Sequence, residues 1–349
     1  MKSKVTIQDI ADALQLSRIT VSKVLNHSPN VSAETRNLVL KKAQEMNYKN
    51  INSGTYSNGK SGLQAKNFAF VMHLTPDAFH IGSGIITQLE QEIRTMGYSL
   101  TLHSITDDDI ASLMLPPNLN RNQTAAIVCL ELFHPEYSRL LCTLGIPVLF
   151  IDACIDFYSL NLECSLLMME NRNSTRRMLS ALCREHGLTS MGFVGDFTHC
   201  LSFHERYDSF LLTAREYGAE TNPYSIIADD SFYSQDGWVR EQLKKMNCLP
   251  QLFFCANDVL AQILIQSLTE LDLQIPEDIM VCGFDGIPSM NTVMNSLTTV
   301  HIPCRELGTC AAQFLFHRIQ YPGGISGAVY LNTRVHFRES APCPSESAQ

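Results

Sequence analysis

The sequence predicts a small all-α head that carries a helix-turn-helix, followed by a larger α/β core built on parallel sheets. Three observations predict this. Residues 5–26 contain two short helical patterns separated by a tight turn. From residue 67 onwards, apolar strand-like runs alternate with amphipathic helices. The head is basic, whereas the rest of the chain is acidic.

The charge of the chain is unevenly distributed. Residues 1–62 hold nine Lys and Arg against four Asp and Glu, a net charge of +5; since the whole chain carries −9, the remainder carries −14. A basic head on an acidic body is typical of a protein that contacts a polyanion with one part only. The 349 residues are enough for two or three compact units.

Several function classes find no support in the sequence. No apolar run reaches the roughly 18 residues of a membrane span, and no apolar segment follows the N-terminal lysines, so we expect a cytoplasmic protein without a membrane partner. The twelve cysteines form no C-x-x-C pair, which predicts free thiols and no zinc site. His199 and His204 lack the spacing of metal ligands on one helix face. No phosphate-binding, nucleotide-binding or nucleophile motif is present, so we expect no cofactor, no metal, no catalytic residue and no enzyme activity.

The first helix of the head is expected to follow Thr6 as N-cap, with Asp9 at the capping-box position. A turn at Gln15 and Leu16 leads to Ser17, a good N-cap for the second helix. A third helix is expected from Ser32. The apolar positions of the first helix recur at i, i+3, i+4 and i+7 and form one buried face: Ile7, Ile10, Ala11 and Leu14.

The second helix is predicted to read DNA. Arg18, Ile19, Ser22 and Lys23 form its outer face, since residues four apart share a side of a helix. Arg18 is placed for guanine O6 and N7, Ile19 for a thymine methyl, and Ser22, Lys23 and Asn26 for phosphates or base edges. The alternative is a three-helix bundle with a solvated basic face. The inward positions of the same helix are Val21, Val24 and Leu25.

The segments VTIQDIADALQLSRITVSKVLN and VSAETRNLVLKKAQEMNY resemble the head of the lac repressor family of bacterial transcription regulators. One departure is Gln15, where the family usually has glycine; in a left-handed conformation this residue costs about 1 kcal/mol relative to glycine. The resemblance implies operator contacts from Thr6, Ser17, Arg18, Ile19, Thr20, Ser22, Lys23, Asn26, Ser32, Thr35 and Tyr48.

Residues 50–66 are rich in Gly, Ser and Asn, a composition typical of a flexible linker. In the family, a short hinge helix at this place orders on DNA and inserts a leucine into the minor groove. Here Ser57 stands near the leucine position, between Gly54 and Gly59. Tyr56 is the substitute wedge that the segment offers, and the alternative, which we favour, is that it stays a disordered aromatic. We therefore expect a poor match to the hinge helix.

Polar residues follow several strand-like runs of the core, where ligands bind in parallel sheets. The runs GFVGD, FFCAND and IMVCGFD, together with ERYDSFLLTAREYG, LTTVHIPCRELG and VHFRES, resemble the effector-binding core of the same family. That core is similar to a periplasmic sugar-binding protein, with two subdomains joined by three crossovers. The implied organisation is a DNA-binding domain at 1–49, the linker at 50–66, a core at 67–340 and a flexible tail at 341–349, with lobe 1 at about 67–165 and 296–327 and lobe 2 at about 166–295 and 328–340.

The resemblance also implies an effector pocket. Arg206 matches a family arginine that can hold ligand oxygens bidentately, although Ser209 replaces a neighbouring glycine. For the acids the alternative is a helix N-cap or an ion pair between the lobes, and for the phenylalanines it is core packing. Glu131 follows another strand-like run and would add negative charge to the cleft. The expected effector-binding residues are Asp152, Arg206, Asn257, Asp285, Phe232 and Phe79.

These observations favour a sequence-specific DNA-binding transcription regulator, most often a repressor in this family. A homodimer would bind a pseudo-palindromic operator in double-stranded DNA. A small-molecule effector, with carbohydrates as one class, would bind between the lobes. The alternative, motivated by the glycine-rich linker, is a ligand- or protein-binding module with weakened specific DNA function.

Overall fold

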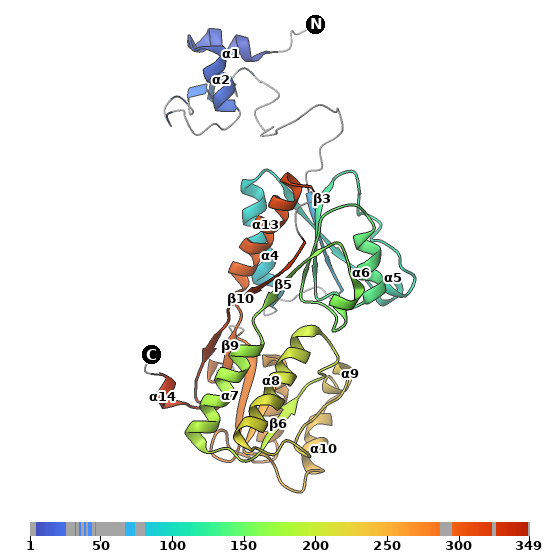
Figure 1. Ribbon diagram of the computed structural model, residues 1–349, viewed down its shortest axis with the longest axis vertical. Coiled ribbons are helices and arrows are strands. Elements are labelled where there is room, and N and C mark those ends of the chain that lie inside the picture. Colours follow the sequence, from blue (N-terminus) through green and yellow to red (C-terminus); the bar gives the residue numbers. More distant parts are fainter. Residues whose placement is uncertain are drawn as a thin grey trace. The chain divides into compact units, whose positions relative to one another are not determined.

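The computed structural model describes residues 5–25, 32, 35, 38–39, 41–43, 46, 67–73, 81–286, 295–322 and 326–347. The chain divides into two compact units, residues 1–64 and 65–349 (Figure 1). Asn26, Tyr48, Phe79 and the linker 50–66 lie outside the described residues, so the expected mismatch to a hinge helix stays a prediction.

The head begins with α1 (Ile7–Leu14) and α2 (Arg18–Leu25). The predicted capping box is confirmed: the Asp9 amide donates to Thr6 Oγ1 at 3.3 Å, and the Thr6 amide donates to Asp9 Oδ2 at 2.6 Å. At the start of α2 the Thr20 amide donates to Ser17 Oγ at 3.0 Å. The helices enclose a small apolar core of Ile10, Ala11, Val21, Val24, Leu25, Val39 and Ala43.

The turn between the two helices depends on Gln15. This residue has φ 54° and ψ 36°, which is the left-handed conformation expected where the family has glycine. The amide of Leu16 donates to the Ala11 carbonyl at 3.0 Å and so closes the C-terminus of α1. Gln15, which has a Cβ atom, therefore adopts a backbone conformation that costs glycine less free energy.

The core contains two sheets, and the first has strand order β10-β5-β4-β3-β1-β2, with all pairs parallel. Figure 1 shows α4 and α13 side by side along this sheet, with α5 and α6 on its other side. The strands are β1 (Asn67–Met72), β2 (Ser99–Ser104), β3 (Thr124–Leu130), β4 (Val148–Ile151), β5 (Ser165–Met169) and β10 (Ala328–Leu331). The helices are α4 (Ile81–Thr95), α5 (Asp107–Ala111), α6 (Pro135–Cys142), the 3₁₀ helix η1 (Phe157–Leu160) and α13 (Cys304–Gln320).

Both faces of the first sheet are buried, which explains the continuous apolar runs in the sequence. In β1, Phe68 and Phe70 pack in the cluster that includes α4 and α13 residues. The alternate residues Ala69 and Val71 pack in a second cluster with Tyr137 of α6. Successive side chains of a strand point to opposite faces, so a strand covered on both sides is apolar at every position.

The second sheet has strand order β11-β9-β8-β7-β6 and is parallel except for the β11–β9 pair. Its strands are β6 (Met191–Val194), β7 (Leu252–Cys255), β8 (Met280–Asp285), β9 (Thr298–His301) and β11 (Arg334–His336). The helices that accompany it are α7 (Arg172–His186), α8 (Leu201–Tyr217), α9 (Asp230–Tyr233), α10 (Trp238–Lys244) and α11 (Asp258–Thr269).

The predicted lobe boundaries are wrong at all three crossovers. β5 and β10 belong to the first sheet, although most of β5 and all of β10 were expected in lobe 2. β9 belongs to the second sheet, although it was expected in lobe 1. The chain therefore crosses at residues 170–171, 302–303 and 332–333, each directly after a strand. Apolar pattern identifies a strand but carries no information about which sheet it joins, so the boundaries were placed too early.

The expectation of a flexible tail from residue 341 is also wrong for the described part of that segment. Ala341 and Cys343 are buried, and α14 (Pro344–Ser347) follows them beside α7 (Figure 1). The Pro342 carbonyl is 2.7 Å from Nε2 of His186, and Ser345 Oγ donates to Glu185 at 2.6 Å. Small apolar residues and hydroxyls thus pack against the C-terminal end of α7.

We predict that Gln15→Gly stabilises the head, because glycine adopts a left-handed conformation without the Cβ penalty. The expected gain is roughly 0.5–1 kcal/mol, net of the extra chain entropy of glycine. Amide hydrogen exchange of α1 in the full chain should slow roughly two- to fivefold. The matched control Ala13→Gly, at an exposed α1 position, should accelerate the same exchange. Faster exchange in both variants would contradict the left-handed conformation of Gln15.

Candidate functional site

The outer face of α2 carries exposed side chains. Arg18 and Lys23 are exposed, and Ile19 is 68 % exposed, whereas Val21 and Val24 on the opposite side are fully buried. The helix therefore presents two cations and one large apolar side chain on one face. These are the groups that recognise guanine edges, phosphates and thymine methyl groups in a major groove.

Five of the predicted DNA contacts are hydroxyl residues that take part in hydrogen bonds of the N-cap type: Thr6, Ser17, Thr20, Ser32 and Thr35. Thr6 caps α1, and Ser17 caps α2 with its Oγ 2.8 Å from Thr20 Oγ1. Ser32 and Thr35 repeat this arrangement, since the Thr35 amide donates to Ser32 Oγ at 3.2 Å. These side chains set the helix starts and therefore the orientation of the exposed face. A direct contact with DNA from any of them stays a prediction.

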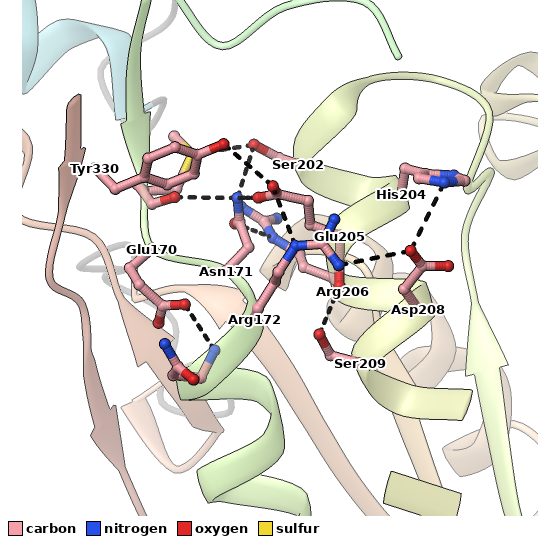
Figure 2. Close-up of polar contacts among 12 residues, drawn as sticks. Glu170, Asn171, Arg172, Ser202, His204, Glu205, Arg206, Asp208, Ser209 and Tyr330 are labelled. Carbon is pink, nitrogen blue, oxygen red and sulfur yellow. Dashed lines mark hydrogen bonds and ion pairs between the residues drawn. The ribbon is translucent and has the colours of Figure 1, made fainter. Parts of the chain in front are cut away.

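A second cluster of polar side chains lies where the chain passes from the first sheet to the second (Figure 2). Its centre is Asn171, which is fully buried. The Asn171 side-chain amide donates to the Met169 carbonyl at 3.1 Å, to Ser202 Oγ at 3.3 Å and to Glu205 Oε2 at 2.8 Å. The cluster thus ties the end of β5 to α8.

Glu205 extends this cluster to the first sheet. Its buried carboxylate accepts hydrogen bonds from Arg172 Nε and from the Tyr330 hydroxyl, both at 3.3 Å (Figure 2). Tyr330 comes from β10, and its hydroxyl is 3.1 Å from that of Tyr158. Burial, Tyr158 and Glu205 all raise the pKa of Tyr330, so its hydroxyl stays protonated and can donate to Glu205.

Arg206, the next residue of α8, is 2 % exposed and is hydrogen-bonded to other protein groups. Its Nε donates to Asn171 Oδ1 at 3.0 Å, and its Nη1 donates to the Ala256 carbonyl at 2.7 Å. Nη1 also lies 3.5 Å from Asp285 Oδ1, and the guanidinium stacks 3.7 Å over the Phe284 ring. Asp285 therefore forms an ion pair, but within the second lobe and not between the lobes, and ligand binding by Arg206 stays a prediction.

The charge of Arg206 acts on both Asp152 and Asp285. Asp152 directly follows β4 and Asp285 ends β8; both are nearly buried, and both have positive φ, 61° for Asp152 and 118° for Asp285. Burial raises the pKa of Asp152, while hydrogen bonds from Ser202 and the Ala153 amide and the charge of Arg206 oppose that rise. Strained, buried carboxylates at strand ends are more frequent at functional sites than elsewhere.

The other expected pocket residues do not join this group in the described part of the chain. Asn257 caps α11, since its Oδ1 accepts the Leu260 amide at 2.9 Å, a role that was not expected for it. Phe232 is 42 % exposed with its ring centroid 5.4 Å from that of Trp238, so the core-packing alternative is wrong for it. Phe79 lies outside the described residues.

Sequence reasoning missed a buried acid next to Asn257. Asp258 accepts the Gly286 amide at 2.8 Å and the Thr299 hydroxyl at 2.6 Å, and so fixes the chain after β8. It also missed the structural roles of Asn171 and Glu205. Asn171 stands directly after a strand, and Glu205 stands next to Arg206. These positions were the available signal, because a polar residue that becomes buried must be paired.

The two lobes touch beside the cluster. The Leu201 amide at the start of α8 donates to the Ala153 carbonyl after β4 at 2.8 Å. The rings of Phe133 and His199 meet edge to face, with centroids 4.9 Å apart. In the described residues no three His, Cys, Asp or Glu side chains are placed to hold a metal ion, and no helix is long and apolar enough to cross a bilayer.

We predict that Arg206→Leu destabilises the protein by roughly 3–5 kcal/mol, because Asp285 and the Asn171 carbonyl oxygen lose a buried partner. Unfolding in urea can be followed through Trp238, the single tryptophan of the chain, which begins α10. The matched control Arg176→Leu breaks an exposed pair with Glu216 and should cost less than about 1 kcal/mol. Equal losses in the two variants would contradict a central role for Arg206.

Two family models match the chain in the order expected from its two units. "Bacterial regulatory proteins, lacI family" matches residues 6–50, and "Periplasmic binding protein-like domain" matches residues 181–341. Among curated relatives, the HTH-type transcriptional repressor PurR of Pasteurella multocida is 24% identical and the match covers 96% of this chain and 98% of the relative. The ribose operon repressor of Halalkalibacterium halodurans is 25% identical, with 90% of each chain covered.

Solved structures show the same fold. The complex of the transcriptional regulator CelR with cellobiose has a TM-score of 0.66 at 20% identity, covering 96% of this chain and 99% of that chain. The lac repressor dimer bound to operator and the anti-inducer ONPF has a TM-score of 0.65 at 20% identity, covering 97% and 100%. The named relatives are transcriptional repressors, not enzymes. With its helix-turn-helix head and two-sheet core, this chain belongs to the lac repressor (lacI) family of bacterial regulatory proteins.

Proposed function

We propose that this regulator is a cytoplasmic repressor that binds a specific operator as a homodimer and responds to a small polyhydroxylated effector held between its two lobes. The observation that carries the proposal is the pairing of an exposed cationic face on α2 with a buried group of strand-end carboxylates around Arg206. The first feature fits DNA, and the second fits a ligand rich in hydrogen-bond donors.

The DNA contact is assigned to the outer face of α2. Arg18 lies in the first turn of the helix, where side chains of a recognition helix reach base edges. Its guanidinium can donate two hydrogen bonds to guanine O6 and N7, and Ile19 can contact a thymine methyl. Two heads related by a twofold axis read two half-sites of a pseudo-palindrome.

The effector class follows from the charges at the cluster. Asp152 and Asp285 are nearly buried; Arg206 lies 3.5 Å from Asp285, and its charge also acts on Asp152. Carboxylates accept hydrogen bonds from hydroxyl groups but repel phosphate or carboxylate groups of a ligand. A neutral carbohydrate therefore suits the site better than an anionic metabolite. The complex of CelR with cellobiose, which has the same fold, supports this class.

Regulation requires that the effector bind one arrangement of the lobes more tightly than another. The crossover segment that carries Asn171 links β5 of the first sheet to α7. A ligand that contacts Asp152 from the first lobe and Asp285 from the second would favour one lobe arrangement. In a dimer, a change in that arrangement alters the spacing of the two heads and hence operator affinity.

The operator prediction concerns Arg18→Ala. Binding to a selected palindromic duplex should weaken by roughly 5- to 150-fold, because one bidentate base contact contributes about 1–3 kcal/mol. Fluorescence anisotropy at fixed salt measures this. Gln8→Ala, an exposed change on α1, is the matched control and should bind as the wild type does. If wild-type protein binds random duplexes as tightly as the selected one, the second candidate, a binding module with weakened DNA specificity, is correct.

The effector prediction is tested by thermal shift of the full chain. Neutral sugars, cellobiose and ribose among them, should include a compound that raises the midpoint, while the corresponding sugar phosphates should not. Asp285→Asn should weaken that sugar roughly tenfold or more, because it loses a charged acceptor. Glu216→Gln, an exposed acid on α8, should change nothing. Stabilisation by phosphates alone, or full stabilisation of Asp285→Asn, would overturn this assignment.

A further inference from the structure

The first two turns of α8 face the first lobe and contact three neighbouring strands of its sheet, β10, β5 and β4. From the end of β4, the Ala153 carbonyl accepts the amide of Leu201 at 2.8 Å. β5 reaches the helix through Asn171, and β10 reaches it through Tyr330, whose hydroxyl donates to Glu205 Oε1 at 3.3 Å (Figure 2). Leu201 and Glu205 lie four residues apart, so these contacts come from one side of the helix.

These three contacts differ in what holds them together. Asn171 lies in a crossover segment, so the chain itself keeps it near α8. The other two contacts join the lobes without a short covalent link and can break when the lobes move apart. Of these two, the bond between Ala153 and Leu201 is made by backbone groups, whereas the bond to Glu205 depends on the side chain of Tyr330.

The hydroxyl of Tyr330 is not needed to keep Glu205 paired. The carboxylate of Glu205 is buried, and it also accepts hydrogen bonds from Arg172 Nε at 3.3 Å and from the Asn171 amide at 2.8 Å. Tyr330 itself is 40 % exposed. Removal of its hydroxyl therefore leaves no buried charge without a partner, and the loss falls on the contact between the lobes more than on the fold.

The contact of Tyr330 is connected to a strand-end carboxylate of the second lobe. Asn171 donates to Glu205, and through its Oδ1 it accepts Arg206 Nε at 3.0 Å. Arg206 Nη1 in turn lies 3.5 Å from Asp285 Oδ1. A continuous series of hydrogen bonds therefore leads from β10 of the first lobe to the end of β8 in the second.

We propose that Tyr330 is a positioning residue: acting through Glu205, it holds the first two turns of α8 against the first lobe and favours the lobe arrangement described above. Loss of its hydroxyl increases the fraction of molecules in which the lobes have separated. The consequence for the effector rests on the proposed function, because it requires a ligand that contacts both lobes. The contact between the lobes does not depend on the identity of any ligand.

Tyr158 provides a matched control from the same lobe. Its hydroxyl lies 3.1 Å from that of Tyr330. Because the single hydroxyl hydrogen of Tyr330 is donated to Glu205, Tyr158 is the donor in the tyrosine pair. The change Tyr158→Phe therefore removes one hydroxyl of the pair but retains the bond between the lobes.

The amide of Leu201 reports whether the lobes are in contact. As the first residue of α8, Leu201 has no acceptor within the helix for its amide, which donates to the first lobe instead. The His204 amide donates to the Cys200 carbonyl at 3.1 Å and reports fraying of the same helix end. Comparison of the two amides separates movement of the lobes from local unfolding of α8.

The experiment is hydrogen exchange of the full chain, resolved to single amides by mass spectrometry. In Tyr330→Phe, exchange should be roughly 2- to 10-fold faster at Leu201, because a hydrogen bond between the lobes is lost, and unchanged at His204. Tyr158→Phe should leave both amides as in the wild type. Unchanged exchange at Leu201 in Tyr330→Phe, equal acceleration in the two variants, or equal acceleration at Leu201 and His204 would overturn the proposal.

The link to the effector is tested separately with cellobiose, ribose and the other neutral sugars of the thermal-shift screen. A sugar that stabilises the wild type should bind Tyr330→Phe roughly 2- to 10-fold more weakly, because the arrangement that it recognises is less populated. Equal affinity for the two proteins would overturn the role of Tyr330 in the effector response. If no sugar stabilises the wild type, the proposed effector is wrong, whereas the exchange at Leu201 still decides the role of Tyr330.

Discussion

One side-chain amide, that of Asn171, determines how the two sheets are joined. Its oxygen accepts from Arg206 and its nitrogen donates to Glu205, so the two opposite charges at consecutive positions of α8 are satisfied by the two ends of one group. Buried charges are costly unless they are paired and hydrogen-bonded. The orientation of the amide is fixed as well, because a reversed amide would place a donor against the arginine and an acceptor against the carboxylate. The ends of β7 and β8 attach to the same arginine through Ala256 and Asp285.

The crossover segments are themselves connected, which limits how the lobes can move. The Glu170 amide donates to the Leu331 carbonyl at 2.8 Å, and the Thr333 hydroxyl donates to the Glu170 carbonyl at 2.7 Å. The Ser174 and Thr333 hydroxyls are 2.5 Å apart. Two of the three crossing segments thus behave as one hydrogen-bonded ribbon. Such a ribbon can bend but resists sliding of one strand past the other, so relative motion of the lobes is directed into hinge bending.

Much of this fold could be predicted from the sequence, because local chemistry specifies local structure. The caps at Thr6 and Ser17 follow from residue type and spacing, and the principal strands of both sheets follow from apolar runs. The left-handed conformation of Gln15 was suggested only by the glycine that the family has at its position. Sheet membership could not be predicted, since β9 and β10 carry the same kind of pattern and differ only in their partners. The polar cluster was also missed in part. Glu205 and Arg206 belong to an amphipathic helix, in which charged residues ordinarily face solvent. Both are buried here because other elements of the fold pack over them, and the sequence pattern of the helix does not show this.

The packed end of the chain has a practical consequence for recombinant work. Ala341 and Cys343 are buried against the second lobe, and the segment up to Ser345 forms hydrogen bonds with Glu185 and His186. Shortening the protein at residue 340 would uncover apolar surface and remove partners from two polar side chains. Leaving residues 341–345 in place preserves these contacts with α7.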